Sequence, residues 1–230
     1  MRVLLADTTA LYEEERFQTL LKSVPECRQK KALKYVRERD RALSLGAGLL
    51  LAIALKDDPR TEADAVAGAH GKLYFPGEDR LFFNLSHSGK RVMLVVSDHE
   101  VGCDVEEIVK TRDYGRIAKR VLSEEELAAL GRCRSEKEKA NRFYRYWTLK
   151  ESFLKATGRG FSLPPATVSL RFRRSGVFAA GPEVPDDCCF QAFDFGDGYA
   201  YAVCQLGAPV PETLTPEWVD FARRSSLWNG

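Results

Sequence analysis

The chain of 230 residues is long enough for one large domain or for two of about a hundred residues each, and its 44% hydrophobic and 30% charged residues are typical of a globular protein. Its 35 basic and 33 acidic residues leave a net charge of only +2, which argues against a general nucleic-acid binder. The longest mostly apolar run, 43–55, is too short to cross a membrane, and the first residues lack the apolar segment of a signal peptide.

The first half of the sequence predicts a strand, a group of helices and then three strands. The apolar periodicity of 3.6 in the early part indicates helices, and the later alternation with turn residues indicates strands. The expected ranges are a strand at 2–6, a helix at 11–24, a basic helix opening at Pro25, a buried helix at 39–55, and strands at 71–75, 81–85 and 91–97.

The second half repeats this order. Ser123 and Glu126 have the spacing of a capping box, which marks the start of a helix. Gly158 is expected to end a long polar helix. The expected ranges are a strand at 101–106, helices at 114–122, 123–130 and 136–157, a strand at 168–172, a hairpin of 189–195 and 199–204, and a terminal helix at 217–227.

This order predicts an α+β protein of two similar lobes with a cleft between them, although no sequence repeat relates the halves. We assign residues 1–100 to an N-terminal lobe, 101–206 to a C-terminal lobe and 207–230 to a C-terminal extension. Sites commonly lie in such clefts.

The six cysteines form no C-x-x-C pair, and no histidine spacing suggests zinc. We therefore expect reduced, free thiols and a cytoplasmic protein.

Asp104 and Glu106 stand two residues apart on an expected strand, so both carboxylates leave the same face. Adjacent negative charges in a partly buried place need a cation, and a set made only of oxygen donors favours Mg²⁺. Such pairs are common, however, and a solvated strand end is the simpler interpretation of this one alone.

Trp147, Glu151 and Lys155 recur at i, i+4 and i+8, so they share one face of the long helix. Glu151 is a candidate third carboxylate if this helix packs across the strand of Asp104. An ordinary Glu–Lys helix pair beside a core tryptophan explains the same spacing.

The turn segment Asn84-Leu85-Ser86-His87-Ser88 places three small polar side chains on one strand face and His87 on the other. Hydroxyls and a histidine near a turn suit contact with phosphate, and a hydrogen-bonded turn explains them equally well. Neither serine lies in a G-x-S-x-G elbow, and the chain has no P-loop.

Taken together and in order, the segments 83–88, 101–106 and 147–155 resemble the signature of the Sfp-type 4′-phosphopantetheinyl transferases. The resemblance runs from about residue 25 to residue 204. It implies two α/β lobes related by a pseudo-twofold axis, with coenzyme A in the cleft. It also implies transfer of the 4′-phosphopantetheine arm of coenzyme A to a serine of an apo acyl or peptidyl carrier protein, as in fatty-acid, polyketide or nonribosomal peptide biosynthesis.

The resemblance further implies roles for individual residues. Asp104, Glu106 and Glu151 would be magnesium ligands, Glu151 also the general base, and Lys155 the group that stabilises the leaving phosphate. The resemblance, together with the polar turn, implies contacts with coenzyme A at Lys72, Asn84, Ser86, His87, Lys150 and Lys155. The basic run adds candidates for the 3′-phosphate, which are Lys30, Lys31 and Arg41.

A basic segment with apolar residues, 110–122, is expected to dock an acidic carrier protein. An ordinary amphipathic helix at the lobe interface explains it equally well. The expected contacts are Lys110, Arg116, Ile117, Arg120, Val121 and Leu122.

Two other functions fit the same residues: a magnesium-dependent phosphodiesterase or nuclease, and a non-catalytic coenzyme A binding module. We expect no nucleic-acid or membrane partner for the transferase, and a monomer, because two lobes in one chain can form a complete site.

Overall fold

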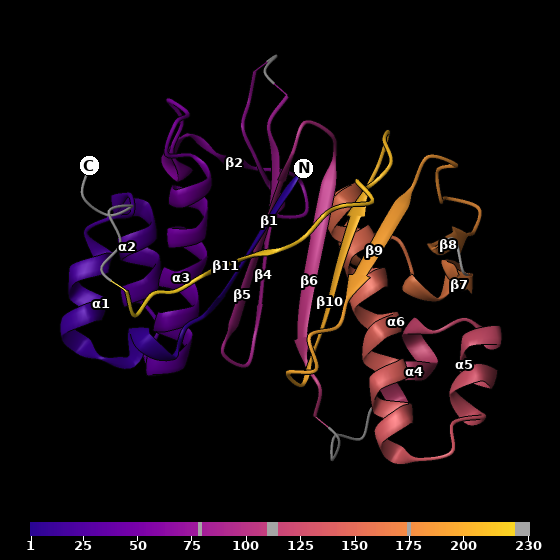
Figure 1. Ribbon diagram of the computed structural model, residues 1–230. Coiled ribbons are helices and arrows are strands. Elements are labelled where there is room, and N and C mark those ends of the chain that lie inside the picture. Colours follow the sequence, from indigo (N-terminus) through magenta and orange to yellow (C-terminus); the bar gives the residue numbers. More distant parts are fainter. Residues whose placement is uncertain (78–79, 110–114, 174–175, 224–230) are drawn as a thin grey trace.

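The computed structural model describes residues 1–77, 80–109, 115–173 and 176–223. It has the α+β architecture expected from the sequence. Two β-sheets lie in the middle of the molecule, with helices α1–α3 on one side and α4–α6 on the other (Figure 1). None of the helices in this described part combines the length and apolar character that a membrane span needs.

The first sheet has the strand order β11-β1-β5-β4 and is covered by the buried helix α3. A small two-stranded sheet, β2-β3, extends from the same lobe. The elements are β1 (Arg2–Asp7), η1 (Thr9–Tyr12), α1 (Glu14–Leu21), α2 (Glu26–Leu33), α3 (Glu38–Ala54), η2 (Glu62–Asp64), β2 (Val66–Ala67), β3 (Leu73–Tyr74), β4 (Phe82–Ser88), β5 (Arg91–Ser97) and β11 (Glu217–Val219).

The second sheet has the order β6-β10-β9-β8-β7, and helix α6 packs on it. The capping box of Ser123 and Glu126 is present at the start of α5, as predicted. The elements are β6 (Val101–Glu107), α4 (Gly115–Val121), α5 (Glu124–Gly131), α6 (Glu136–Thr157), η3 (Gly160–Ser162), η4 (Pro165–Thr167), β7 (Ser169–Arg173), β8 (Gly176–Ala180), β9 (Cys189–Phe193) and β10 (Tyr199–Gln205).

Helix α6 begins and ends where local chemistry requires. The side chain of Ser135 accepts a hydrogen bond from the backbone N–H of Glu138 and so caps the first turn. At the other end Gly158 has φ of 65°, the left-handed conformation that terminates many helices and favours glycine. The predicted bounds of this helix are therefore confirmed.

A glycine on β6 sets how closely α6 approaches the sheet. A Cβ added at Gly102 would collide with the carbonyl oxygen of Ser152 and the amide nitrogen of Ala156. The neighbouring β10 offers small side chains to the same helix, at Ala200 and Ala202. Strand β6 can thus lie directly beneath α6.

The two sheets share a hydrophobic core. Buried side chains of β1 and β5 pack with those of β6 and β10, in a cluster separate from the cores under α3 and α6. Its largest side chains include Tyr201, Met93 and Leu5. The boundary that we place between residues 100 and 101 therefore remains an interpretation of a chain whose halves are packed together.

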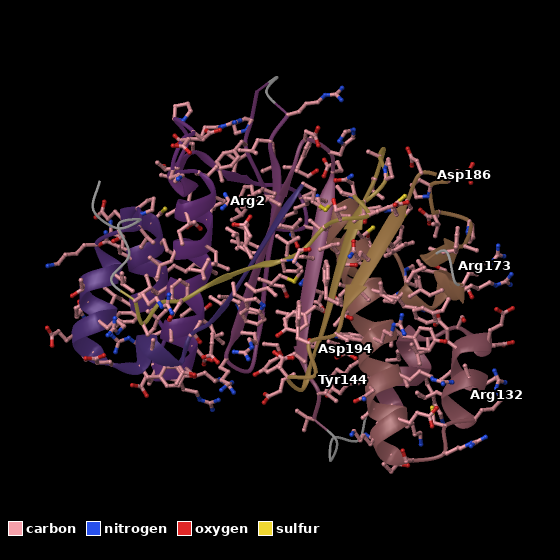
Figure 2. The ribbon with its side chains drawn as sticks, in the orientation of Figure 1. Arg2, Arg132, Tyr144, Arg173, Asp186 and Asp194 are labelled. Carbon is pink, nitrogen blue, oxygen red and sulfur yellow. The ribbon has the colours of Figure 1, made fainter. Side chains whose placement is uncertain are left out.

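The prediction of a helix at 217–227 is wrong for its described part. Residues 217–219 form β11, which pairs in parallel with β1, and Phe221 is buried in the core under α3. Arg2, labelled in Figure 2, forms an ion pair with Glu217 across this junction, at 2.8 Å. The segment after residue 206 therefore returns to the first lobe, because a free strand edge and a core position are available there.

Candidate active site

Strand β6 presents two carboxylates to helix α6. Gly102, Asp104 and Glu106 alternate with Cys103 and Val105, which point into the core shared by the sheets. Asp104 is buried and Glu106 half-buried. The predicted common face of the two acidic residues is confirmed.

The expected face of α6 lies over these carboxylates. The Nζ of Lys155 is 2.6 Å from Oδ1 of Asp104, and the indole Nε1 of Trp147 donates to Oε1 of Glu106 at 3.2 Å. Glu151 lies one helical turn from both Trp147 and Lys155, and the negative charges of Asp104 and Glu106 act to raise its pKa. The i, i+4, i+8 pattern thus directs the side chains of Trp147, Glu151 and Lys155 toward the carboxylates of β6.

Strands β4 and β6 lie side by side in different sheets, and side chains join them. The backbone N–H groups of Cys103, Val105 and Glu107 donate to the side chains of Asn84, Ser86 and Ser88, at 3.0, 3.3 and 3.1 Å. We call these three contacts the seam. They provide acceptors for backbone N–H groups on the edge of β6, which would otherwise need a neighbouring strand.

The seam also touches the carboxylates. The hydroxyl of Ser86 donates to Oδ1 of Asp104 at 2.8 Å, and that of Ser88 donates to Oε2 of Glu106 at 2.7 Å. Lys155 donates to Ser86 as well, at 3.0 Å. One hydroxyl offers one donor and two acceptor positions, so Ser86 has none left for a phosphate in this conformation.

The electrostatics of this cluster are those of acids held close together. Burial raises the pKa of Glu151 to about 7, and the charges of Asp104 and Glu106 add to the effect while Lys155 opposes it. Burial also raises the pKa of Asp104 and of Glu106. For Lys155, burial alone would lower the pKa, but the groups around it, Asp104 first and then Cys103 and Glu151, together outweigh burial, and the net shift is upward.

These residues fit a hard divalent cation by their chemistry. Oδ2 of Asp104 and Oε1 of Glu151 are buried without a hydrogen-bond partner, and such orphaned oxygens carry an energetic cost that a cation would remove. Only oxygen donors are present, which suits Mg²⁺. Within the described ranges, however, no three acidic, histidine or cysteine side chains already form a coordination shell, and Lys155 occupies one oxygen of Asp104.

His87 lies on the opposite face of β4 from Ser86, as predicted, and is exposed at the surface. Its pKa is nevertheless lowered, first because surrounding groups keep water from part of the ring and then because Lys155, Lys31 and Arg28 oppose a further positive charge. These positive charges suit an anion on this side of the carboxylates.

Two lysines predicted to contact coenzyme A make contacts within the protein, and for Lys72 the contact with coenzyme A stays a prediction. Lys150 is buried, with its ammonium 2.6 Å from Glu126, and it also donates to the carbonyls of Val121 and Pro165. Its assignment as a coenzyme A ligand is wrong, because none of its donors is free. Lys72 pairs with Glu100 at 2.5 Å and donates to the carbonyl of Ala156, where it holds the end of α6.

The other candidate contacts differ in where they lie. Lys31 is close enough to His87 to affect it, whereas the exposed Lys30 pairs with Glu26 on α2. Arg41 stacks over the ring of Phe17, 4.4 Å from its centroid, and pairs with Glu14, so the structure does not bring it to the carboxylates. The side chain of Asn84 is used by the seam.

The expected docking segment is only partly available to a partner. Arg116 and Arg120 are exposed, and Ile117 is half-buried. Val121 and Leu122 are buried in the core of the second lobe, so their assignment as contact residues is wrong: the apolar face of α4 packs inward. Lys110 lies outside the described residues.

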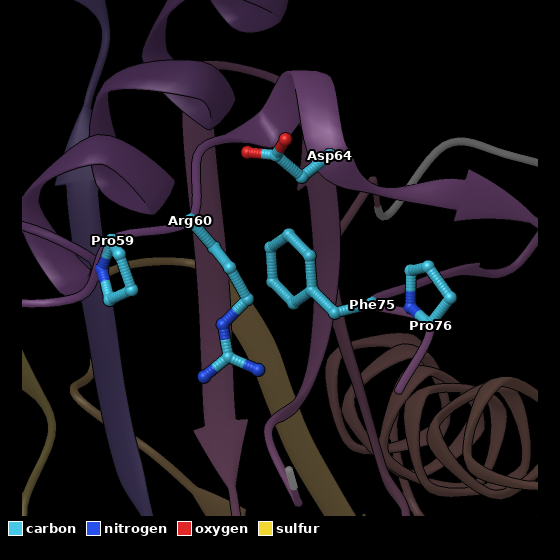
Figure 3. A pocket seen from close by; sticks show the side chains of 5 residues that line it. All are labelled: Pro59, Arg60, Asp64, Phe75 and Pro76. Carbon is cyan, nitrogen blue, oxygen red and sulfur yellow. The ribbon is translucent and has the colours of Figure 1, made fainter. Parts of the chain in front are cut away.

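Two cavities are lined by residues other than Asp104, Glu106 and Glu151. One of about 320 Å³ is lined by Pro59, Arg60, Asp64, Phe75 and Pro76, with the guanidinium of Arg60 over the ring of Phe75 (Figure 3). A larger one of about 980 Å³ lies between the first half of α6 and the β9–β10 hairpin, and Ala200, the β10 partner of Glu106, lines it.

Sequence reasoning missed two residues of the site. Ser88 and the indole N–H of Trp147 both contact Glu106, although Trp147 was expected only to anchor the helix in the core. The position of Ser88 on the same strand face as Ser86 was the signal available for it.

The part of the chain that contains β6 and α6 matches a known protein family. Residues 100–204 match the model of the 4′-phosphopantetheinyl transferase superfamily. The chain belongs to this family.

Its relatives include the 4′-phosphopantetheinyl transferase Sfp of Bacillus subtilis (strain 168), with 31% identity over 88% of this chain and 90% of Sfp. The 4′-phosphopantetheinyl transferase ffp of Bacillus subtilis is 31% identical over 89% of this chain and 92% of its own length. The 4′-phosphopantetheinyl transferase AcpT of Salmonella typhi is 41% identical over 51% of this chain and 59% of its own length. A solved holo-(acyl-carrier-protein) synthase of Bacillus anthracis has a TM-score of 0.40 at 16% identity, over 47% of this chain and 96% of that one.

Proposed function

We propose that this protein transfers the 4′-phosphopantetheine group of coenzyme A to a serine of an apo carrier protein. The observation that carries the proposal is the meeting of Asp104 and Glu106 on β6 with Glu151 and Lys155 on α6, in a member of this transferase family. Phosphoryl transfer depends on positioning and on neutralising charge, and this group of side chains is suited to both.

We propose that Asp104, Glu106 and Glu151 hold Mg²⁺. The unpartnered oxygens of Asp104 and Glu151 support this assignment. When bound, the ion would neutralise charge on the pyrophosphate of coenzyme A.

Glu151 is the proposed base, directly or through a water. In the metal-free protein, burial and the neighbouring carboxylates raise the pKa of Glu151 to about 7, which makes it a stronger base than an ordinary glutamate. The serine Oγ forms a bond to the β-phosphorus, its proton passes to Glu151, and the bond from that phosphorus to the bridging oxygen breaks. Adenosine 3′,5′-bisphosphate leaves, and the ammonium of Lys155 stabilises the charge that develops on it.

His87 and Lys31 are the proposed phosphate contacts of coenzyme A. The mutual repulsion of the positive charges near His87 supports this, because an anion there would relieve it. Lys30 is kept as a weaker candidate, since its salt bridge with Glu26 is exposed and easily exchanged.

We place carrier docking at the exposed side chains of α4, Arg116 and Arg120, beside the half-buried Ile117. Charge reversal at both arginines should raise the KM for the carrier and leave the KM for coenzyme A unchanged. We further propose a cytoplasmic monomer, since all six cysteines are free thiols and a single chain supplies every proposed site residue.

Incubation of the protein with an apo carrier, coenzyme A and Mg²⁺ tests the function, with the carrier mass as readout. We expect a gain of one phosphopantetheine for the wild type and none for Glu151→Gln. Glu107→Gln is the matched control, because the exposed Glu107, the residue directly after Glu106 on β6, lies by Gly89 and outside the cluster. Nucleotide cleavage without carrier modification would support the phosphodiesterase instead, and binding of coenzyme A with no reaction would support the binding module.

A further inference from the structure

Both oxygens of the Glu106 carboxylate are held by donors that come from different parts of the fold. Ser88, on β4 of the first sheet, donates its hydroxyl to Oε2 at 2.7 Å. Trp147, on α6 of the second lobe, donates its indole N–H to Oε1 at 3.2 Å. Rotation of this carboxylate would break both bonds.

We propose that Ser88 and Trp147 are positioning residues that fix the carboxylate of Glu106 for a divalent cation. The inference rests on the proposed function, because it takes Glu106 as a metal ligand. A carboxylate oxygen can accept a hydrogen bond with one lone pair and bind a cation with the other, so the two donors leave a metal-facing position on each oxygen.

Each donor is itself held in place. The hydroxyl of Ser88 accepts the backbone N–H of Glu107 at 3.1 Å, so its single proton is directed to Glu106. The indole of Trp147 stacks on Phe143, with ring centroids 6.3 Å apart and planes 19° from parallel. Groups with locked rotamers orient a ligand better than mobile ones do.

The arrangement also explains why two lobes are needed for one carboxylate. The contact of Ser88 depends on the position of β4, and the contact of Trp147 depends on the position of α6. Glu106 therefore takes its observed orientation only when β4 and α6 both lie correctly against β6. Ser86 acts in the same way on Asp104, but it also contacts Lys155 and gives a less specific test.

The test is Mn²⁺ binding to the substrate-free protein, measured by electron paramagnetic resonance, for Ser88→Ala and Trp147→Phe. The phenylalanine keeps a ring for the stack on Phe143 and removes only the N–H donor. We expect the Mn²⁺ dissociation constant to rise about tenfold in each variant, as is typical when a hydrogen-bond partner of a metal ligand is removed. Ser88→Thr keeps the hydroxyl and should restore binding.

Two controls separate positioning from stability. Trp218→Phe removes the indole of an exposed tryptophan on β11 and should leave Mn²⁺ binding unchanged. Asn84→Ala breaks a seam contact that touches no carboxylate, so it should lower the melting temperature without weakening Mn²⁺ binding.

Steady-state kinetics give a second readout. The Mg²⁺ concentration for half-maximal transfer should rise about tenfold in Ser88→Ala and Trp147→Phe, while kcat at saturating Mg²⁺ stays near that of the wild type. Trp147→Phe provides an independent test should Ser88→Ala not fold. Normal Mn²⁺ binding in the variants of an active wild type overturns this inference alone, whereas a wild type that binds no Mn²⁺ overturns the proposed metal site with it.

Discussion

Replacement of Glu151 by glutamine should stabilise the metal-free protein at alkaline pH. Burial and the neighbouring carboxylates raise the pKa of Glu151 from 4.5 to about 7, so the folded protein holds this proton more tightly than the unfolded chain does. Below pH 4.5 the group is protonated in both states and costs nothing. As the pH rises from 4.5 to about 7 its contribution becomes increasingly unfavourable, and above 7 it levels off.

The size of the effect follows from the shift. An interval of about 2.5 pKa units corresponds to at most about 3.4 kcal/mol. Because the side chain is only half-buried, water screens part of this, and we expect about 1–2 kcal/mol. Glutamine has nearly the same shape and replaces one carboxylate oxygen by an NH2 group, so the comparison removes the charge with little change in volume.

The assay is urea denaturation with a chelator at pH 5 and pH 8, with Glu107→Gln as control. Glu151→Gln should be more stable than the wild type by about 1–2 kcal/mol at pH 8 and by less than about 0.5 kcal/mol at pH 5. Saturating Mg²⁺ should stabilise the wild type more than the variant. An equal difference at both pH values, or a variant less stable at pH 8, would refute the reasoning.

Three further changes test other parts of the structure. Gly102→Ala should cost about 2–4 kcal/mol of stability and most of the transferase activity, because the new methyl group forces α6 away from β6; melting temperature and carrier mass measure the two. Lys150→Met should cost about 3–5 kcal/mol in urea denaturation by leaving Glu126 buried and unpaired, and adding Glu126→Gln should recover part of the loss. His87→Ala should raise the KM for coenzyme A at least about tenfold with a smaller change in kcat, and a change confined to kcat would contradict the phosphate contact.

The carboxylate cluster could be predicted from the sequence because two periodicities define it. The repeat of two on a strand puts Asp104 and Glu106 on one face, and the i, i+4 spacing on a helix aligns Glu151 with Lys155. Periodicity does not show which residues of other elements pack against each face of the helix. The helical periodicity shows that Lys150 points away from Glu151. It does not show that Lys150 meets Glu126, a residue of the preceding helix.

The same limit explains the errors at the seam and at the end of the chain. The common face of Asn84, Ser86 and Ser88 was predictable, but their partners on β6 are backbone groups, which leave no signature in the sequence. Residues 217–219 are too few for a strand pattern, and their partner β1 lies more than two hundred residues earlier. Pairing over that distance depends on the fold as a whole.

The return of β11 to β1 has a consequence for how the protein is made. Strand β1 leaves the ribosome before both of its neighbours, because β5 follows only after residue 90 and β11 only after residue 216. The edge of the first sheet therefore stays open until synthesis has passed through the whole second lobe. During that time the nascent first lobe offers an unpaired strand to any extended segment nearby, and its final closure must wait for a partner more than two hundred residues later in the chain.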